Sequence, residues 1–392
     1  MQNNKNKSRR KFLQTGITLG ALMPLMGNSL QVNADIKKNT SVNSAKSLNP
    51  LKILILGGTS FLGPQQIAYA LNRGHSISTF TRGRTKPRVQ KDIFNEVEQL
   101  IGDRNNNLDS LRNRKWDVVI DNSGNKLQWV KDAVDLLKNN VDLYLYTSST
   151  GVYYPYLGND IRENTKPVLK TPDGITAVQK VEYDYGVMKA NSEMEVIKNF
   201  GKERSIIVRP TYMIGPGDVS YRFTYWPERI ARGGEIMVPG KADDPVQYID
   251  VRDVANWMIR LVENKKAGIY NAVGPASVTG MQAFVYGVHA AFNSKVNFVM
   301  IPDYEFLAKQ NIFDSIPWIM PVDENYGSAR VNNNFAIENG LTYTPLAQTI
   351  KDIHDWWNSD AISDEQRAKL LNGANSLMQK EPAIIAGWKA RN

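Results

Sequence analysis

Three side chains suited to proton transfer occur in the middle of the chain: Ser149, Tyr185 and Lys189. Tyr185 and Lys189 are four residues apart, so a helix places the phenol and the ammonium on one face. A nearby positive charge favours the phenolate and is expected to lower the pKa of Tyr185 from its ordinary value near ~10. Such a tyrosine can exchange a proton with a substrate oxygen, which a serine hydroxyl can hold. We therefore predict that these three residues are catalytic; a surface tyrosine beside a solvated lysine is the alternative.

A glycine-rich turn follows the first strongly apolar run of the chain, Ile53–Leu56. Four consecutive apolar residues suit a strand that is buried on both faces, as in a parallel sheet. Gly57 and Gly58 allow a tight turn, and Gly63 allows the following helix to pack closely. Backbone N–H groups converge at such a turn, which favours a bound pyrophosphate over a purely structural turn. The residues predicted to bind a nucleotide here are Gly57, Thr59, Ser60, Phe61, Leu62 and Gly63.

A basic turn, Arg82–Arg84, follows a second predicted strand, Ser76–Thr81. A dinucleotide fold usually places an acidic residue near this point, where it holds the ribose hydroxyls of adenosine. No acidic residue occurs between Gly57 and Lys91. The guanidinium groups of Arg82 and Arg84 can instead neutralise a 2′-phosphate, so NADP is favoured over NAD; a solvated basic loop is the alternative.

Strand and helix patterns alternate through the first half of the chain. Beyond the first two strands, we predict a helix at Leu127–Leu137 and strands at Val97–Ile101, Asp117–Asp121, Leu143–Thr147 and Ser205–Arg209. This alternation predicts an α/β fold: a Rossmann-type doubly wound parallel sheet with a smaller C-terminal substrate-binding lobe. Ligands bind at the carboxyl ends of such strands. We therefore add Asp103, Asn122 and Ser123, together with Lys189, to the predicted cofactor site.

The first fifty residues carry most of the excess positive charge. The 392-residue chain has a net charge of +9, but residues 1–50 hold eight basic residues against one acid, which leaves 40 basic and 38 acidic residues elsewhere. A basic nucleic-acid-binding face on the folded part is not implied. Ser8–Leu13 resembles a twin-arginine export motif, and the apolar run behind it is too short to span a membrane comfortably. We expect twin-arginine export to the periplasm or another extracytoplasmic place, without a stable membrane anchor; a disordered basic tail is the alternative.

The chain has no cysteine and only three histidines. Disulfides, thiolate metal sites and cysteine nucleophiles are therefore excluded. The histidines lie far apart and form no H-E-x-x-H motif, so we predict no metal site.

Taken together, these motifs resemble the extended short-chain dehydrogenase/reductase superfamily, and within it the NAD-dependent epimerase/dehydratase group. The matching pieces span about residues 51–360 and are Gly57–Gly63, Gly102-Asp103, Ser149–Tyr153, Tyr185–Lys189, Arg209-Pro210, Gly215–Asp218 and Val246–Asp253. Thr81–Thr85 and Trp226–Gly234 are similar to a branch that includes chloroplast stem-loop-binding proteins and bacterial reductase-like proteins. Relatives often dimerise through helices that flank the tyrosine, so the resemblance also implies a homodimer.

Two features depart from the pattern of this family. Ser60 replaces the usual middle glycine of the loop, which crowds the approach of a pyrophosphate. The interval from Ser149 to Tyr185 is longer than usual and predicts an inserted loop near Pro155–Thr176 at the substrate mouth. We divide the chain into an export signal at 1–34, a disordered lead-in at 35–50, a dinucleotide-binding domain at 51–210, a substrate-binding lobe with sheet-completing elements at 211–360, and peripheral C-terminal helices at 361–392.

The predicted function is that of an exported NAD(P)-dependent epimerase- or dehydratase-like enzyme that acts on a sugar-like or other hydroxyl-bearing small molecule. NADPH recycling is not expected outside the cytoplasm, which favours a redox-neutral cycle with a retained cofactor. One alternative is an NADPH-dependent carbonyl reductase with a diffusible cofactor. Another is a non-catalytic nucleotide- or RNA-binding protein, against which the Ser–Tyr–Lys set and the near-neutral body argue. We accordingly expect no nucleic-acid partner.

Overall fold

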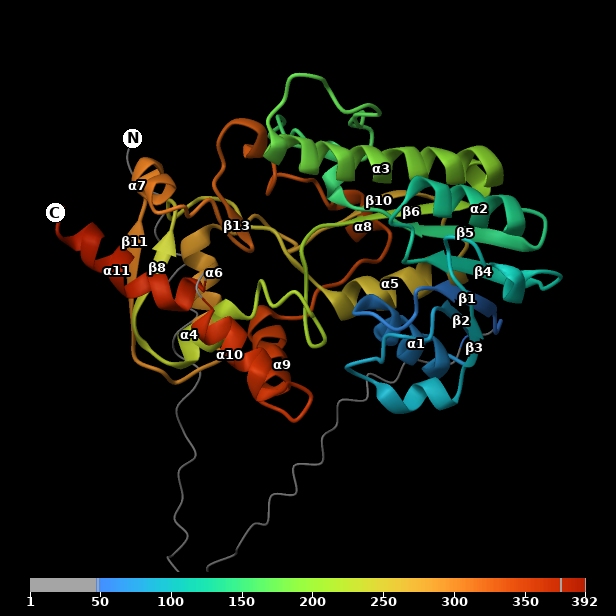
Figure 1. The fold of residues 1–392 in the computed structure, drawn as a ribbon, viewed down its shortest axis with the longest axis horizontal. Helices are drawn as coiled ribbons and strands as arrows, with labels where there is room; N and C mark the ends of the chain where they lie inside the picture. The colour runs from blue at the N-terminus through green and yellow to red at the C-terminus, as the bar shows by residue number, and fades with distance from the viewer. Residues whose placement is uncertain (1–46, 48, 374–375, 392) are drawn as a thin grey trace, which may run out of the picture. The chain divides into compact units, whose positions relative to one another are not determined.

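The strands of the main sheet run parallel in the order β10-β6-β5-β4-β1-β2-β3 (Figure 1). Their bounds are β1 Lys52–Leu56, β2 Ser76–Thr81, β3 Glu98–Ile101, β4 Trp116–Asp121, β5 Val141–Thr147, β6 Ser205–Pro210 and β10 Gly268–Ala272. The chain builds β2 and β3 on one side of β1 and then returns to the other side with β4. A switch point therefore lies between β1 and β4, and the predicted doubly wound α/β sheet is confirmed.

The computed structural model describes residues 47, 49–373 and 376–391. The predicted export signal and nearly all of the predicted lead-in lie outside the described residues, so both remain predictions. None of the helices in the described ranges combines the length and the apolar character that a membrane crossing needs.

Two layers of helices cover the main sheet. Helices α1 (Leu62–Asn72) and α5 (Val251–Glu263) pack on one face, and α2 (Leu127–Leu137) and α3 (Ala177–Phe200) pack on the other (Figure 1). Side chains alternate between faces along a strand. In β1, Ile53 and Ile55 accordingly join the core beneath α1 and α5, whereas Leu54 and Leu56 join the core beneath α2 and α3. The apolar run of β1 is thus explained by burial on both sides.

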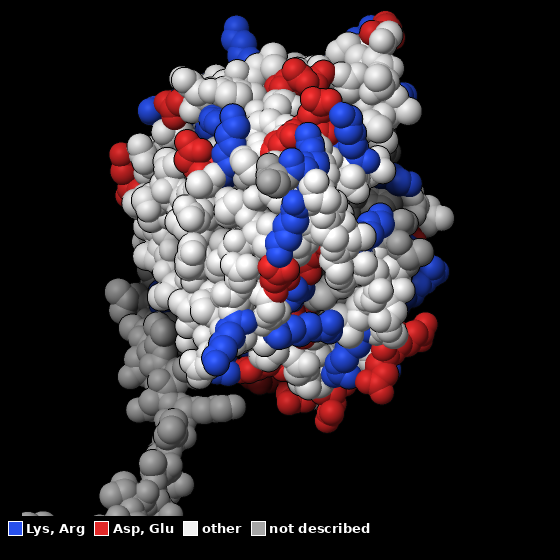
Figure 2. All heavy atoms as spheres, turned by 90° about the vertical axis from the view of Figure 1, so that its left-hand side faces the viewer, with Lys and Arg blue, Asp and Glu red and all other residues white. Residues whose placement is uncertain are grey.

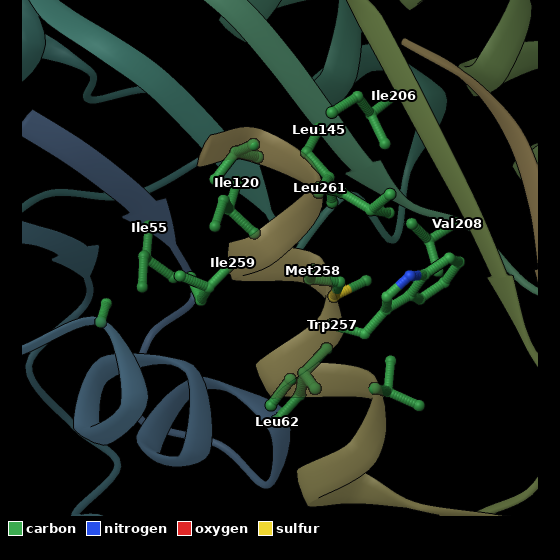
Figure 3. Packing of buried hydrophobic residues seen from close by; sticks show 14 of the residues in the cluster. Ile55, Leu62, Ile120, Leu145, Ile206, Val208, Trp257, Met258, Ile259 and Leu261 are labelled. Carbon is green, nitrogen blue, oxygen red and sulfur yellow. The ribbon is translucent and has the colours of Figure 1, made fainter. Parts of the chain in front are cut away.

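Helix α5 supplies a large part of the core beneath the β1 turn. Figure 3 shows Trp257, Met258, Ile259 and Leu261 directed toward side chains of the strands. The indole Nε1 of Trp257 donates a hydrogen bond to the carbonyl of Asn339 at 2.9 Å, so the buried polar atom of this side chain is satisfied. Because α5 also packs along α1, it holds the helix that follows the glycine turn.

A second lobe is formed by segments that follow β6. Its strands are β7 Met213–Ile214, β8 Gly234–Pro239, β9 Ile249–Asp250, β11 Val296–Ile301, β12 Asp314–Ser315 and β13 Trp318–Ile319. Its helices are α4 Tyr225–Ala231, α6 Met281–His289, α7 Tyr304–Lys309, α9 Leu346–Trp357, α10 Asp364–Asn372 and α11 Leu377–Lys389, whereas α8 Asn334–Glu338 packs against β10 of the main sheet. A separate hydrophobic cluster, with Trp226, Phe284 and Trp318 buried in it, lies among these elements.

Within the stretch Val246–Asp250 only β9 at Ile249–Asp250 forms a strand, and it pairs with β7. The preceding backbone bonds to a loop instead. The amide of Val246 donates to the carbonyl of Thr279 at 3.0 Å, and the amide of Tyr248 donates to that of Gly274 at 2.9 Å. These isolated contacts replace a continuous ladder.

The C-terminal helix α11 is attached to the second lobe through a buried carboxylate. Glu381 is 1% exposed and forms an ion pair with Arg229. The same carboxylate accepts hydrogen bonds from the amide of Met237 at 2.8 Å and from the hydroxyl of Tyr225 at 3.1 Å. Ile384 and Ile385 of this helix are buried in the lobe's cluster. Part of the segment predicted to be peripheral therefore contributes to a core.

We expect Glu381→Ala to lower the free energy of unfolding by about 3–5 kcal/mol, because it leaves the buried Arg229 charge without its partner. Lys389→Ala is the control on the same helix. Lys389 pairs with Glu235 at the surface, where an ion pair contributes about 0–1 kcal/mol. Urea unfolding of both variants measures the difference, and equal stability losses would contradict a docking role for Glu381.

Candidate active site

Two cavities meet at the carboxyl ends of the parallel strands. We call one the Tyr185 cavity; its volume is about 540 Å³, and Ser149, Tyr185 and Lys189 line it. We call the other the glycine-turn cavity; its volume is about 300 Å³, and the β1 turn and the basic turn after β2 line it. Asn122 and Asn125 belong to the linings of both cavities. The two cavities are therefore neighbours, joined where β4 ends.

The structure brings most of the predicted site residues to these two cavities. The glycine-turn cavity is lined by Gly57, Thr59, Ser60, Arg82, Arg84, Asp103, Asn122 and Ser123. Phe61 lies instead in the lining of the Tyr185 cavity. The side chain of Leu62 belongs to the core beneath α1 and α5, and Gly63 lines neither cavity.

Gly63 permits the closest backbone approach in the β1 turn. A Cβ atom at this position would lie 2.2 Å from the carbonyl oxygen of Gly58, far inside van der Waals contact. The amide of Gly63 donates to the carbonyl of Ser60 at 2.8 Å, which closes the turn before α1. Any side chain at Gly63 would push the helix away from the turn, so the predicted packing role of this glycine agrees with the geometry.

The basic turn and Asp103 face each other across the glycine-turn cavity. The pKa of the Asp103 carboxyl lies below its ordinary value, chiefly because of hydrogen bonds from Asn105 and to a lesser extent because of the Arg82 and Arg84 charges. Arg82 and Arg84 are themselves exposed. This end of the cavity therefore presents two accessible cations and one carboxylate.

A buried ion pair between Arg104 and Asp121 lies at the end of β4, where the two cavities meet. Arg104 donates to both oxygens of Asp121, at 2.8 and 2.9 Å, and Tyr144 donates to Asp121 at 2.8 Å. Burial alone would raise the pKa of Asp121, but the Arg104 charge and these hydrogen bonds outweigh it and hold that pKa below its ordinary value. Arg104 also donates to the hydroxyl of Ser123 at 3.0 Å. The pair thus sets the position of Ser123 at the end of β4.

The side chain of Asn122 is held from two elements. Its amide nitrogen donates to Gln66 of α1 at 2.6 Å, and its oxygen accepts from the hydroxyl of Thr147 of β5 at 2.8 Å. Both partners of Asn122 are part-buried or buried. Asn122 is therefore held in a fixed orientation between the glycine-turn cavity and the Tyr185 cavity.

Helix α3 carries Tyr185 and Lys189 on one face, as predicted. It begins with a capping box in which Thr176 and Gln179 exchange hydrogen bonds with each other's backbone amides. Gly186 allows the helix to approach the segment after β5, because a Cβ atom there would lie 2.3 Å from the carbonyl oxygen of Gly151. Tyr185 directly precedes this contact in the chain, and the close packing of the helix places its ring beside the Gly151 segment that follows Ser149.

Tyr185 lines the same cavity as Ser149. The expected lowering of its pKa is wrong for this state. The pKa of Tyr185 is raised, first because burial in the cavity disfavours the phenolate, even though 43% of the residue is exposed. Ser149 and the charge of Arg222 oppose this rise, while Glu182 adds to it. The opposing cation is therefore Arg222, a residue that the sequence patterns did not single out.

Lys189 is buried and turned toward backbone oxygens. Its Nζ donates to the carbonyl of Thr147 at 3.0 Å and to that of Gly124 at 3.4 Å. It also lies 5.0 Å from the ring centroid of Tyr146. Burial lowers the pKa of the Lys189 ammonium to about 8, against the opposite pull of Asp121 and Glu193. The ammonium thus lines the Tyr185 cavity, with a pKa near neutral pH.

A second buried network fixes α3 to the ends of β5 and β6. Arg209 donates to both oxygens of Glu193, at 2.9 and 2.6 Å, and Ser148 donates to Glu193 at 2.5 Å. Arg209 also donates to the carbonyl of Glu163 at 3.2 Å, in the inserted loop. This loop contributes Tyr156 to the Tyr185 cavity. The network therefore links the inserted loop, the segment that contains Ser148 and helix α3.

Several residues of the site were missed from the sequence. Arg104 directly follows the Gly102-Asp103 motif. Its positive charge could have indicated an acidic partner, which in the structure is the buried Asp121. Glu182 and Arg222 line the Tyr185 cavity from α3 and from the segment before α4. Glu182 lies three residues before Tyr185, a helical spacing that could have indicated it. No local pattern pointed to Arg222.

Among the described residues, no group of three or more His, Asp or Glu side chains is arranged to hold a metal ion.

Comparison with known proteins gives a family and a fold. The model of the NAD dependent epimerase/dehydratase family matches residues 53–273. The chloroplast stem-loop binding protein of 41 kDa b from Arabidopsis thaliana is 28% identical over 242 residues, which cover 58% of this chain and 60% of that protein. The chain thus matches less than two thirds of the length of this relative.

Two solved structures share the fold. The Bordetella bronchiseptica enzyme WbmH, in complex with NAD+, has a TM-score of 0.57 and 14% identity, with 80% of this chain and 100% of that chain covered. UDP-glucuronic acid 4-epimerase from Bacillus cereus, in complex with NAD, has a TM-score of 0.55 and 16% identity, with 80% and 99% covered.

The depressed pKa of Lys189 predicts a pH-dependent stability. Below pH ~8 the lysine is protonated in the folded and the unfolded chain, and its burial destabilises the folded state in full. Between about 8 and the ordinary value of 10.5 the folded chain loses its proton first, so this destabilisation fades as the pH rises. We expect the stability of Lys189→Met relative to wild type to fall by roughly 2 kcal/mol between about pH 7.5 and 9.5.

Urea unfolding at both pH values measures this effect. Lys131→Met, at an exposed position on α2, is the control and should show no such trend. A pH-independent difference between Lys189→Met and wild type would contradict the depressed pKa.

Proposed function

The chain belongs to the NAD dependent epimerase/dehydratase family, and we propose that it is an exported NAD(P)-dependent enzyme that oxidises and reduces a hydroxyl-bearing carbon of a sugar-like molecule. The observation that carries this proposal is the junction of the two cavities at Asn122 and Asn125. One cavity offers a glycine turn and two arginines, and the other offers Ser149, Tyr185 and Lys189. A dinucleotide that spans both would have its adenosine half in the first and its nicotinamide half in the second.

The residues of the glycine-turn cavity fit such a group. Gly63 keeps the turn free of a side chain where α1 begins, which leaves backbone N–H groups available for a pyrophosphate. Arg82 and Arg84 would pair with a 2′-phosphate, which supports NADP as the preferred cofactor. Ser60 lines the same cavity, where a glycine would leave more room.

The residues of the Tyr185 cavity would handle the substrate proton. A bound nicotinamide supplies the acceptor and donor of hydride. Tyr185 takes the proton of the substrate hydroxyl as its carbon is oxidised and returns it on reduction, and Ser149 holds the same oxygen. The cycle starts from the phenolate, which Arg222 and Ser149 favour; burial, which raises the pKa of Tyr185, favours the phenol that forms and then returns the proton. Lys189, buried in the lining of the same cavity, would place a positive charge beside the nicotinamide half.

A redox-neutral reaction, epimerisation or dehydration, is the class that we favour. The solved relatives are named as epimerases or as NAD complexes, and UDP-glucuronic acid is one of the substrates that their names give. Export through the Ser8–Leu13 motif would remove the protein from the cytoplasmic supply of NADPH. An enzyme that returns its hydride to the substrate and retains its cofactor would work without that supply.

Two measurements test the enzyme assignment. The purified protein should release a nicotinamide dinucleotide on denaturation, detected by mass spectrometry. Tyr185→Phe should keep this cofactor but lower turnover of UDP-sugars by roughly 10²–10⁴-fold, because the acid/base group is lost. Tyr183→Phe, two residues away and outside the cavity lining, is the control. Full turnover by Tyr185→Phe would overturn the catalytic role. Cofactor binding only on addition would favour a reductase, and no nicotinamide binding would favour a non-catalytic protein.

The preference for NADP is tested separately. We expect Arg82→Ser/Arg84→Ser to weaken NADP binding by roughly 10–100-fold, as the loss of one or two charge-assisted hydrogen bonds would do, and to change NAD binding little. Arg112→Ser/Lys115→Ser removes the same charge from another surface segment and should leave both affinities unchanged. Isothermal titration calorimetry measures the six dissociation constants, those of NAD and NADP with the wild type and with each of the two variants. An equal loss for NAD and NADP would contradict recognition of the 2′-phosphate.

A further inference from the structure

A third cavity extends outward from the glycine-turn cavity; we call it the outer basic cavity. Its volume is about 900 Å³, within the range of small-ligand sites. Thr59, Thr81 and Arg84 are among the residues that line both cavities. The outer basic cavity then continues past Arg84 to Lys86, Arg88 and Lys91, three cations that the glycine-turn cavity does not contain.

The charge of this cavity is unbalanced. Arg84, Lys86, Arg88 and Lys91 line it, and among the described residues its lining includes no carboxylate. Lys86 and Lys91 are exposed and form no ion pair with a described residue, and Asp92, which adjoins Lys91 in the chain, is not part of the lining. A 2′-phosphate carries about −1.5 to −2 charges at neutral pH. Such a group beside Arg84 would therefore leave the outer cations without an anion.

The outer wall of the cavity is fixed by packing. Arg88 donates to the hydroxyl of Tyr221 at 2.8 Å, and Gln366 of α10 donates to the same oxygen at 3.0 Å. The ring of Tyr221 packs edge-on against Trp357, with 5.1 Å between ring centroids. Gln366 itself lines the cavity. The guanidinium of Arg88 is thus held in place before any ligand binds.

We propose that the outer basic cavity is a binding site for a small oligophosphate anion, separate from the cofactor's 2′-phosphate. The three outer cations, Lys86, Arg88 and Lys91, can pair with a chain of two or three phosphates, and Arg88 supplies a positioned guanidinium for one of them. Such a ligand would contact the adenosine end of the site and could regulate occupancy of the cofactor cavity.

The lining favours a small anion over a nucleic acid. Proteins that bind single strands stack the bases on exposed aromatic rings. The aromatic residue in this lining is Phe94, which is only 6% exposed. On the face of the second lobe that Figure 2 shows, basic and acidic side chains are interspersed rather than gathered into a basic track.

Titration calorimetry with tripolyphosphate tests the proposal on the full chain. We expect tripolyphosphate to bind wild-type protein and to bind Lys86→Gln/Lys91→Gln at least about tenfold more weakly, while the affinity of the double variant for NAD is unchanged. The control, Lys131→Gln/Lys202→Gln, removes the same charge from two exposed lysines outside this cavity. It should bind tripolyphosphate as wild type does.

Four outcomes would overturn the proposal. Wild-type protein that does not bind tripolyphosphate lacks the site. Equal weakening in the test and control variants would show a general charge effect. A matching loss of NADP affinity in Lys86→Gln/Lys91→Gln would make these lysines part of the 2′-phosphate site. Tighter binding of a single-stranded RNA oligonucleotide through the same lysines would assign the cavity to a nucleic acid. Because the expected result does not involve Tyr185 or turnover, it can fail while the proposed enzyme activity holds, and the reverse.

Discussion

The buried Asp121–Arg104 pair is the interaction on which the site most depends. Asp121 ends β4 at the switch point and is fully buried, so its charge is stable there only because Arg104 and Tyr144 hydrogen-bond to it. Arg104 in turn holds Ser123, and a Cβ atom at Gly57 would lie 2.7 Å from the Cβ of Ser123. The ion pair, the end of β4 and the β1 turn are thus locked together. The charge of Asp121 also acts on Lys189 and keeps its pKa from falling further.

A similar arrangement supports the neighbouring cavity. The Glu193–Arg209 pair joins α3 to β6 and, through Ser148, to the residue before Ser149. Both ion pairs lie at the carboxyl edge of the sheet. Their charged groups are buried there, next to cavities that are open to polar ligands. Each has two charge-assisted hydrogen bonds between its partners, the geometry that best offsets desolvation of the charges. The inserted loop is attached to this edge of the sheet by the hydrogen bond from Arg209 to the carbonyl of Glu163.

Much of this could be predicted from the sequence because it depends on local patterns. The strand β2 and the helix α2 have the predicted bounds, since apolar periodicity and flanking glycines or polar residues mark them directly. The glycine turn, the basic turn and the Tyr185–Lys189 spacing are also local. In contrast, Arg222 reaches Tyr185 from a distant segment, and the direction of Lys189 toward Thr147 and Gly124 depends on how α3 docks on β5. The predicted lowering of the Tyr185 pKa was wrong because the spacing of residues along a helix indicates which side chains are near one another but does not indicate how deeply they are buried.

The central claim is that one dinucleotide occupies the glycine-turn cavity and the Tyr185 cavity together. A crystal structure of the protein with NADP measures this most directly. The account predicts the adenosine phosphate beside Arg82 and Arg84 and the nicotinamide ring in the cavity of Ser149, Tyr185 and Lys189. A dinucleotide bound elsewhere, or one whose nicotinamide ring lies outside the Tyr185 cavity, would contradict it.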